Sequence, residues 1–219
     1  MTGLNNINHS QRFMNSLRYC RRMQFTNRCN GQPQVLPNYN VLLHGASMVQ
    51  LYYLLVAEYE AVNHSHIWYM LESEALVKAM LFHDGIEQFT GDILAPAKWK
   101  APTECSIIEQ RVYAAMKDNG DIYDQFNIVY TDDHIEEELD QNELHVFKYL
   151  DMAEYALRLL EERSCGNNHE RVKLGLHNAR KVCKDLYGVV EDNNRIKEFL
   201  RPLHSHLMNK TREFVWEED

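Results

Sequence analysis

Apolar residues recur at intervals of three and four along most of this chain, which is the spacing of one face of an α-helix. Only 5 Pro and 9 Gly interrupt the 219 residues, too few for the many turns of an all-β protein of this length. The pattern therefore predicts an all-α fold. The expected helices span residues 6–22, 43–62, 67–82, 104–117, 141–162, 170–187 and 195–214.

Length, charge and cysteine usage narrow the class of protein. A hydrophobic content of 45% over this length suits one sizeable core, so we expect a single domain. The formal net charge of -9 argues against a nucleic-acid-binding protein, because binding to such polyanions depends on Lys and Arg. The 5 Cys are scattered without CxxC spacing, so we expect neither a disulfide framework nor a zinc knuckle.

The N-terminal residues are polar and lack the apolar stretch of a secretory signal. No window of the sequence approaches the length that a membrane-spanning helix needs. We therefore expect a cytoplasmic protein without a membrane partner, in the cytoplasm of a host cell if the gene is carried by a phage.

Two histidines and two aspartates fall on the inward faces of three expected helices. His44 shares a helix face with Met48, His83 and Asp84 close the next long helix, and Asp151 lies among apolar residues of a later one. Each alone has a structural explanation, as a hydrogen-bonded core histidine or as an aspartate paired with Lys or Arg. A carboxylate in apolar surroundings is otherwise costly unless it binds a cation.

Taken together, the four residues indicate a metal site in the core of a helical bundle, where ligands converge from facing helices. Their mixed nitrogen and oxygen donors suit one divalent ion, which could be Mn, Co, Mg, Fe or Zn, and do not suit a closed thiolate site. Such a set leaves coordination positions open for water and for a phosphate oxygen.

This set of residues resembles the H…HD…D signature of the HD-domain metal-dependent phosphohydrolases. The run Glu-Gln-Phe-Thr-Gly-Asp at 87–92 and the run Pro-Ala-Lys-Trp at 96–99 resemble the bacterial 5'-deoxynucleotidase branch of that superfamily. The resemblance covers about residues 16–168. Residues 169–214 lie beyond it, and the apolar spacing there predicts additional C-terminal helices. The resemblance also implies a homodimer or a higher homo-oligomer.

The resemblance implies a role for each site residue. The two histidines and two aspartates would bind one divalent metal, and Glu87 would act as the acid/base near the attacking water. Arg22 would contact the phosphate, and Lys98 could help on the same anion. Asp92 would lie near the sugar, where it would favour a 2'-deoxyribose over a ribose.

Three departures from the family pattern affect the expected site. The family usually carries Glu and Ser beside the first metal-binding histidine, whereas Leu43 and Gly45 stand here, so we expect that histidine to lack polar support. An aromatic that stacks on the base usually follows the Arg. Met23 stands there with Phe25 close behind, and both are candidate substrate contacts. The loop at 30–40 is longer than usual and falls where the nucleotide would enter.

The function implied by the resemblance is metal-dependent hydrolysis of 2'-deoxynucleoside 5'-phosphates, most simply of a monophosphate to deoxynucleoside and phosphate. One alternative is a deoxynucleoside triphosphohydrolase, for example of the dATP type, that releases tripolyphosphate. Another is a regulatory HD protein that binds nucleotides without cleaving them. A further alternative is a helical interaction protein in which the histidines and aspartates are structural.

Overall fold

The computed structural model describes residues 14, 17–18, 20–28, 34–36, 39–63, 74–91, 100–118, 135, 138–190, 194–212 and 214. The named elements within these residues are all helices: α2 (Val41–Asn63), α4 (Glu74–Phe82), α5 (Glu87–Thr90), α7 (Pro102–Asp118), α9 (Gln141–Ser164), α10 (Glu170–Val189) and α11 (Asn194–Thr211). A single antiparallel bridge joins Asn27 to Asn40 just before α2. The all-α prediction is confirmed.

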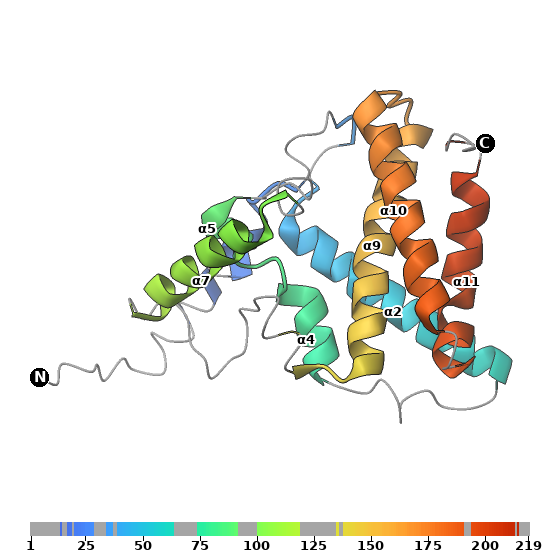
Figure 1. Cartoon of the computed structure of the whole chain (residues 1–219), viewed down its shortest axis with the longest axis horizontal. Helices are drawn as coiled ribbons and strands as arrows, with labels where there is room; N and C mark the ends of the chain where they lie inside the picture. The colour runs from blue at the N-terminus through green and yellow to red at the C-terminus, as the bar shows by residue number, and fades with distance from the viewer. Residues whose placement is uncertain are drawn as a thin grey trace, which may run out of the picture.

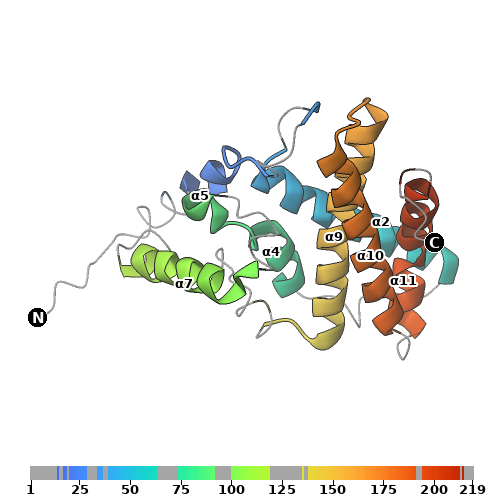
Figure 2. The same cartoon turned by 45° about the horizontal axis from the view of Figure 1, so that its top comes forward.

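Helices α9 and α10 lie side by side and antiparallel, and α11 packs against both of them (Figure 1). Helix α2 crosses this group and contacts α9 and α11, while α4 packs against α2 and α9. Helices α5 and α7 contact each other on the side away from α10 and α11 (Figure 2). The first turns of α2, the end of α4 and the middle of α9 therefore meet.

The main core fills the space between α2, α4, α9, α10 and α11. Its largest fully buried side chains are Met48, Tyr52, Leu76, Met80, Tyr149, Leu150 and Phe199. A smaller buried cluster of Met23, Val41 and Ile86 joins the segment before α2 to the turn before α5. These two clusters hold the three helix segments that carry the predicted histidines and aspartates.

The start of α9 is fixed by a capping box, which the sequence encodes as Asp-Gln-Asn-Glu at 140–143. The Asp140 side chain accepts hydrogen bonds from the N–H groups of Asn142 and Glu143 at 2.8 and 2.9 Å. The Glu143 carboxylate accepts in return from the Asp140 N–H at 3.1 Å. This arrangement satisfies N–H groups that have no partner within the helix, and it fixes where the helix that carries Asp151 begins.

The observed helix ends differ from the expected ones by a few residues. Helix α2 begins at Val41, where Asn40 caps it by accepting from the Leu43 N–H at 2.9 Å, and α11 ends at Thr211. The first turns expected for the helix at 67–82 lie outside the described residues. The short helix α5 was not predicted separately.

Helix α2 corrects one expectation. By length and composition alone it is apolar enough to cross a membrane, whereas the sequence was expected to contain no such segment. In this fold α2 contacts α4, α9 and α11, and it buries His44 and Met48. A helix that packs into a folded core can meet the same test of composition, and here 39% of the apolar window is buried.

Gly45 allows α2 and α4 to approach closely beside the predicted metal site. A Cβ atom at this position would lie 2.8 Å from the carbonyl oxygen of Met80 and 2.9 Å from that of Leu81. Both are backbone atoms of α4, so a side-chain rotation cannot relieve the contact. The absence of a side chain here therefore sets how near His44, the preceding residue, can come to the end of α4.

We expect Gly45→Ala to lower the free energy of unfolding by about 1–3 kcal/mol, because the added methyl group must push α2 away from α4. Gly188→Ala in α10 is the matched control, since a Cβ there meets nothing within 4 Å. The control should stabilise the protein by up to about 1 kcal/mol through helix propensity. Urea unfolding measures the free energy of unfolding of both variants. Equal changes of the same sign in the two variants would contradict the close approach of α2 and α4.

Candidate metal centre

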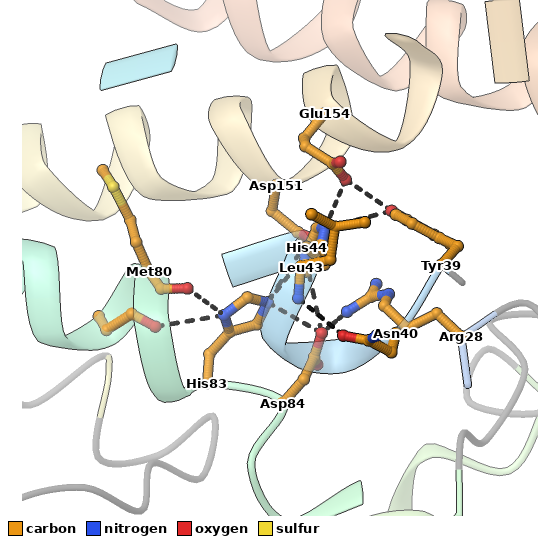
Figure 3. Close-up of polar contacts among 11 residues, drawn as sticks. Arg28, Tyr39, Asn40, Leu43, His44, Met80, His83, Asp84, Asp151 and Glu154 are labelled. Atoms are coloured by element: carbon orange, nitrogen blue, oxygen red, sulfur yellow. Dashed lines mark hydrogen bonds and ion pairs between the residues drawn. The ribbon is translucent and has the colours of Figure 1, made fainter. Parts of the chain in front are cut away.

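The structure brings together the four residues that the sequence singled out, from three helix segments (Figure 3). The Nε2 atom of His44 lies 3.3 Å from Nε2 of His83 and 3.0 Å from Oδ1 of Asp151. The carboxylate of Asp84, which follows α4, lies 3.1 Å from His83 Nε2 and 3.7 Å from His44 Nε2. Two imidazole nitrogens and two carboxylate oxygens thus face one small volume.

Each imidazole is oriented by a partner at its other nitrogen. The Nδ1 atom of His83 lies 3.2 Å from the backbone carbonyl oxygens of Ala79 and Met80, which can only accept, so Nδ1 carries the proton. On the His44 side, Nδ1 lies 2.5 Å from Oε2 of Glu154. A histidine that donates through Nδ1 presents the lone pair of Nε2, which is the form that binds metals.

Glu154 corrects the expectation that His44 lacks polar support. The carboxylate is buried, contacts His44 Nδ1, and also accepts a hydrogen bond from the Tyr39 hydroxyl at 2.6 Å. The support comes from α9, one helical turn after Asp151, and not from the neighbours of His44 in sequence. Residues three apart on a helix share a face, so α9 presents both carboxylates to the same histidine.

The surroundings raise the pKa of one histidine and lower the pKa of the other. Burial and the nearby Arg28 charge lower the pKa of His44, but the carboxylates of Glu154 and Asp151 outweigh them and leave it above its usual value. Burial lowers the pKa of His83. Burial alone would raise the pKa of Asp151, but the two nearby imidazoles, which attract the carboxylate when they are protonated, hold it well below its usual range.

Asp151 is less buried than its apolar neighbours in sequence predicted. Its side chain is 32% exposed, whereas the side chain of His44 is completely buried. The Asp151 side chain is therefore partly accessible to solvent, while its Oδ1 atom lies 3.0 Å from Nε2 of His44 and 3.7 Å from Nε2 of His83.

These donors fit a divalent metal ion. When both histidines donate through Nδ1, their Nε2 lone pairs face each other at 3.3 Å with two carboxylates beside them. Electron-rich atoms at this separation repel each other, and a shared cation turns the repulsion into attraction. Suitable donor atoms of His44, His83 and Asp84 all lie within 4.8 Å of one another. The Nε2 and carboxylate donors match the mixed set that Mn, Co, Fe and Zn accept.

Arg28 is a residue of the site that the sequence did not predict. Its guanidinium contacts the Asp84 carboxylate, and its side chain is 15% exposed. Its backbone N–H donates to the Tyr39 carbonyl oxygen at 3.0 Å, which ties it to the residues just before α2. No local motif marks Arg28, because it reaches the site through pairing of two loop segments.

Glu87 lies in α5 and is buried, with 3% of its surface exposed. Its N–H donates to the Asp84 carbonyl oxygen at 2.9 Å, so the two acidic residues are one helical turn apart, as expected. Its role as the acid/base remains a prediction.

The predicted substrate contacts have different surroundings. Arg22 and Phe25 are exposed, and the Phe25 N–H donates to the Arg22 carbonyl oxygen at 2.9 Å. Met23 is fully buried against Val41 and Ile86, so of the two candidates for contact with a base only Phe25 is accessible. The two remaining predicted residues, Asp92 and Lys98, lie outside the described residues.

We expect Glu154→Gln to weaken binding of Mn²⁺ by about 10–100-fold, as other losses of an outer partner of a metal-binding histidine do. The amide is a weaker acceptor for the His44 proton. Tyr39→Phe is the companion variant, because it removes one donor to Glu154 and leaves the contact of Glu154 with His44 in place. Calorimetric titration with Mn²⁺ should rank the affinities wild type, Tyr39→Phe, Glu154→Gln, and the reverse order of the two variants would contradict this role.

Comparison with known proteins agrees with this site. The model of the family described as 5'-deoxynucleotidase YfbR-like matches residues 15–201. The fold is similar to the crystal structure of an HD-domain phosphohydrolase from Listeria innocua, with a TM-score of 0.56 and 18% sequence identity over 90% of this chain and 99% of that chain. No curated protein matches the chain significantly.

The family match spans the two histidines, both aspartates and Glu87. HD-domain phosphohydrolases are metal-dependent hydrolases, and the His/Asp group found here could hold such a metal. The match over most of the chain shows that this chain belongs to the YfbR-like 5'-deoxynucleotidase family.

Proposed function

We propose that this protein hydrolyses 2'-deoxynucleoside 5'-monophosphates to the deoxynucleoside and inorganic phosphate. The observation that carries the proposal is the convergence of two Nε2 atoms and two carboxylates from three helix segments. The description of the matching family as a 5'-deoxynucleotidase supports the choice of substrate.

His44, His83, Asp84 and Asp151 would hold one divalent ion. A divalent ion bound there supplies two things, a lowered pKa for water and polarisation of a phosphoryl oxygen. Glu87, one turn after Asp84, would take the proton of the attacking water as the phosphorus–oxygen bond to the 5' oxygen breaks. Water adds one oxygen to the phosphate, and the 5' oxygen leaves with a proton.

Arg28 provides the positive charge nearest to the described donors. Its guanidinium contacts Asp84, so a modest rotation of the side chain would allow it to meet a phosphate oxygen in the same volume. Arg prefers such oxygens because its planar group can donate two parallel hydrogen bonds. We propose Arg28 as a phosphate contact, with Arg22 and Lys98 as further cations, Asp92 beside the deoxyribose and Phe25 beside the base.

The proposal is tested by incubating the protein with Mn²⁺ or Co²⁺ and panels of deoxynucleoside monophosphates, deoxynucleoside triphosphates and ribonucleoside monophosphates. Release of inorganic phosphate from deoxynucleoside monophosphates, with slower cleavage of the ribonucleotides, is the expected result. Tripolyphosphate released only from triphosphates would replace the proposal with a triphosphohydrolase. Nucleotide binding without turnover in any divalent metal would indicate the regulatory alternative.

A further inference from the structure

The residues that support the metal centre continue along one stripe of α9. Asp151 and Glu154 face the two histidines, and Arg158 and Glu162 follow at intervals of four residues. Residues at this spacing lie on the same side of a helix. The C-terminal part of this stripe, with Arg158 and Glu162, contacts segment 34–36, which precedes α2. One face of α9 therefore contacts both the metal site and this segment.

Glu162 is buried and holds the backbone of segment 34–36. Its carboxylate accepts hydrogen bonds from the N–H of Val35 at 2.8 Å and from the N–H of Leu36 at 3.0 Å. The Asn167 side chain donates to the same group at 2.8 Å. Burial raises the pKa of Glu162, but these hydrogen bonds outweigh burial and leave it below its usual value, so the carboxylate is ionised at neutral pH.

Arg158 completes the attachment. Its Nη2 atom donates to the Leu36 carbonyl oxygen at 2.8 Å and to Glu162 at 3.3 Å. Its guanidinium also lies over the ring of Tyr39, 5.0 Å from the centroid. Glu162 thus accepts from two backbone N–H groups of segment 34–36, and Arg158 donates to one of its carbonyl oxygens. Arg158 also contacts Tyr39, which donates to Glu154.

The attached segment is connected in turn to Arg28. The side-chain amide of Gln34 donates to the Arg28 carbonyl oxygen at 2.7 Å, and the Arg28 N–H donates to the Tyr39 carbonyl oxygen at 3.0 Å. A second pairing joins the Val41 N–H to the Thr26 carbonyl oxygen at 3.0 Å. Arg28 is thus held by the chain segments that Arg158 and Glu162 fasten to α9.

We infer that the Arg158–Glu162 pair is a positioning device for phosphate recognition. By fastening segment 34–36 to α9, it holds Arg28 and Tyr39 against the metal centre, with Arg28 placed to meet the anion. The inference rests on the proposed function in taking a phosphate group as the ligand. Arg158 and Glu162 contact neither the metal donors nor the proposed phosphate position, and they reach the metal site only through Tyr39. Loss of the pair should therefore weaken anion affinity more than metal affinity.

The test compares Glu162→Gln with Glu161→Gln, a control on the same helix whose exposed carboxylate also lies 3.7 Å from Arg158. Exposed ion pairs contribute little, so this control removes a charge beside Arg158 and keeps the acceptor for the N–H groups of Val35 and Leu36. Glu162→Gln keeps the shape of the side chain but turns an NH₂ group toward one of the two backbone N–H donors, which then has no acceptor there. We expect its Mn²⁺-loaded form to bind inorganic phosphate about ten-fold more weakly than wild type, a difference of about 1.4 kcal/mol. Mn²⁺ affinity should fall by less than phosphate affinity, because the contact between Tyr39 and Glu154 is only indirectly affected. The control should match wild type in both affinities.

Amide hydrogen exchange provides a second measurement that does not depend on any ligand. The N–H groups of Val35 and Leu36 should lose protection in Glu162→Gln and keep it in Glu161→Gln. If Glu162→Gln does not fold, Arg158→Lys is measured in its place and should show the same loss of phosphate affinity and of amide protection. A lysine cannot reproduce the paired donors or the contact with the Tyr39 ring.

The proposal is overturned if wild type binds no phosphate, if Glu162→Gln and Glu161→Gln bind it equally, or if Mn²⁺ affinity falls as much as phosphate affinity. The last result would show a merely structural role. Failure of the proposed function would look different, since a wild-type protein that cleaves no deoxynucleotide can still show the expected ranking of phosphate affinities.

Discussion

Replacement of Asp151 by alanine is expected to abolish specific Mn²⁺ binding and to reduce phosphatase activity by at least about 10³-fold, since a catalytic metal contributes several kcal/mol to transition-state stabilisation. The physical reason is that Asp151 supplies the α9 carboxylate of the site, 3.0 Å from His44 Nε2. Calorimetry with Mn²⁺ and release of phosphate from deoxynucleoside monophosphates measure the two effects.

Asp185→Ala in α10 is the control for Asp151→Ala, because it removes an exposed aspartate from the neighbouring helix. Both variants should keep the helical circular dichroism of wild type. An Asp151→Ala protein that is folded, binds Mn²⁺ as wild type does and cleaves its substrate would contradict the assignment of this carboxylate.

Glu87→Gln is expected to lower kcat by about 10²–10⁴-fold, the usual contribution of a general acid or base. The variant should bind Mn²⁺ with nearly unchanged affinity, because the four donor atoms do not include this carboxylate. The pair of measurements therefore separates proton transfer from metal binding. Steady-state kinetics in Mn²⁺, together with a metal titration, provides both values.

Glu104→Gln provides the control, since this glutamate is exposed in the first turn of α7. It should leave kcat and Mn²⁺ affinity at the wild-type values. If Glu87→Gln keeps full kcat, another group must accept the proton. If it loses Mn²⁺ as completely as Asp151→Ala, Glu87 is instead a metal ligand.

Much of the fold could be predicted from the sequence, because helical periodicity follows directly from which residues face the core. The spacing of apolar residues along α2 places His44 inward, and in the structure this residue is fully buried. The approach of His44, His83, Asp84 and Asp151 follows from the same periodicity together with a family signature. The spacing of apolar residues is sufficient to predict the orientation of a side chain when that orientation depends only on its own helix.

The parts that the sequence did not reveal depend on contacts between distant segments. Glu154 reaches His44 across 110 positions, and Glu162 reaches Val35 across 127. Arg28 approaches Asp84 only because two loop segments pair. In each case the side chain is ordinary for its local sequence. The spacing of Asp151 and Glu154 on α9 was the one signal that could have pointed to the support of His44.

Gly45 shows the same limit in another form. In sequence it looked like the loss of a polar neighbour of His44, whereas in the structure it makes room for the backbone of α4. The departure from the family pattern therefore concerns how closely two helices pack. Only the position of the facing helix distinguishes these two meanings.

The most direct test of the metal centre is anomalous X-ray diffraction from crystals grown with Mn²⁺. We predict an anomalous peak bounded by Nε2 of His44, Nε2 of His83 and the carboxylates of Asp84 and Asp151, each within about 2.0–2.3 Å of the ion, the range of metal–nitrogen and metal–oxygen bonds. Well-ordered histidines and aspartates at this site with no anomalous peak between them, in crystals saturated with Mn²⁺, would contradict the account.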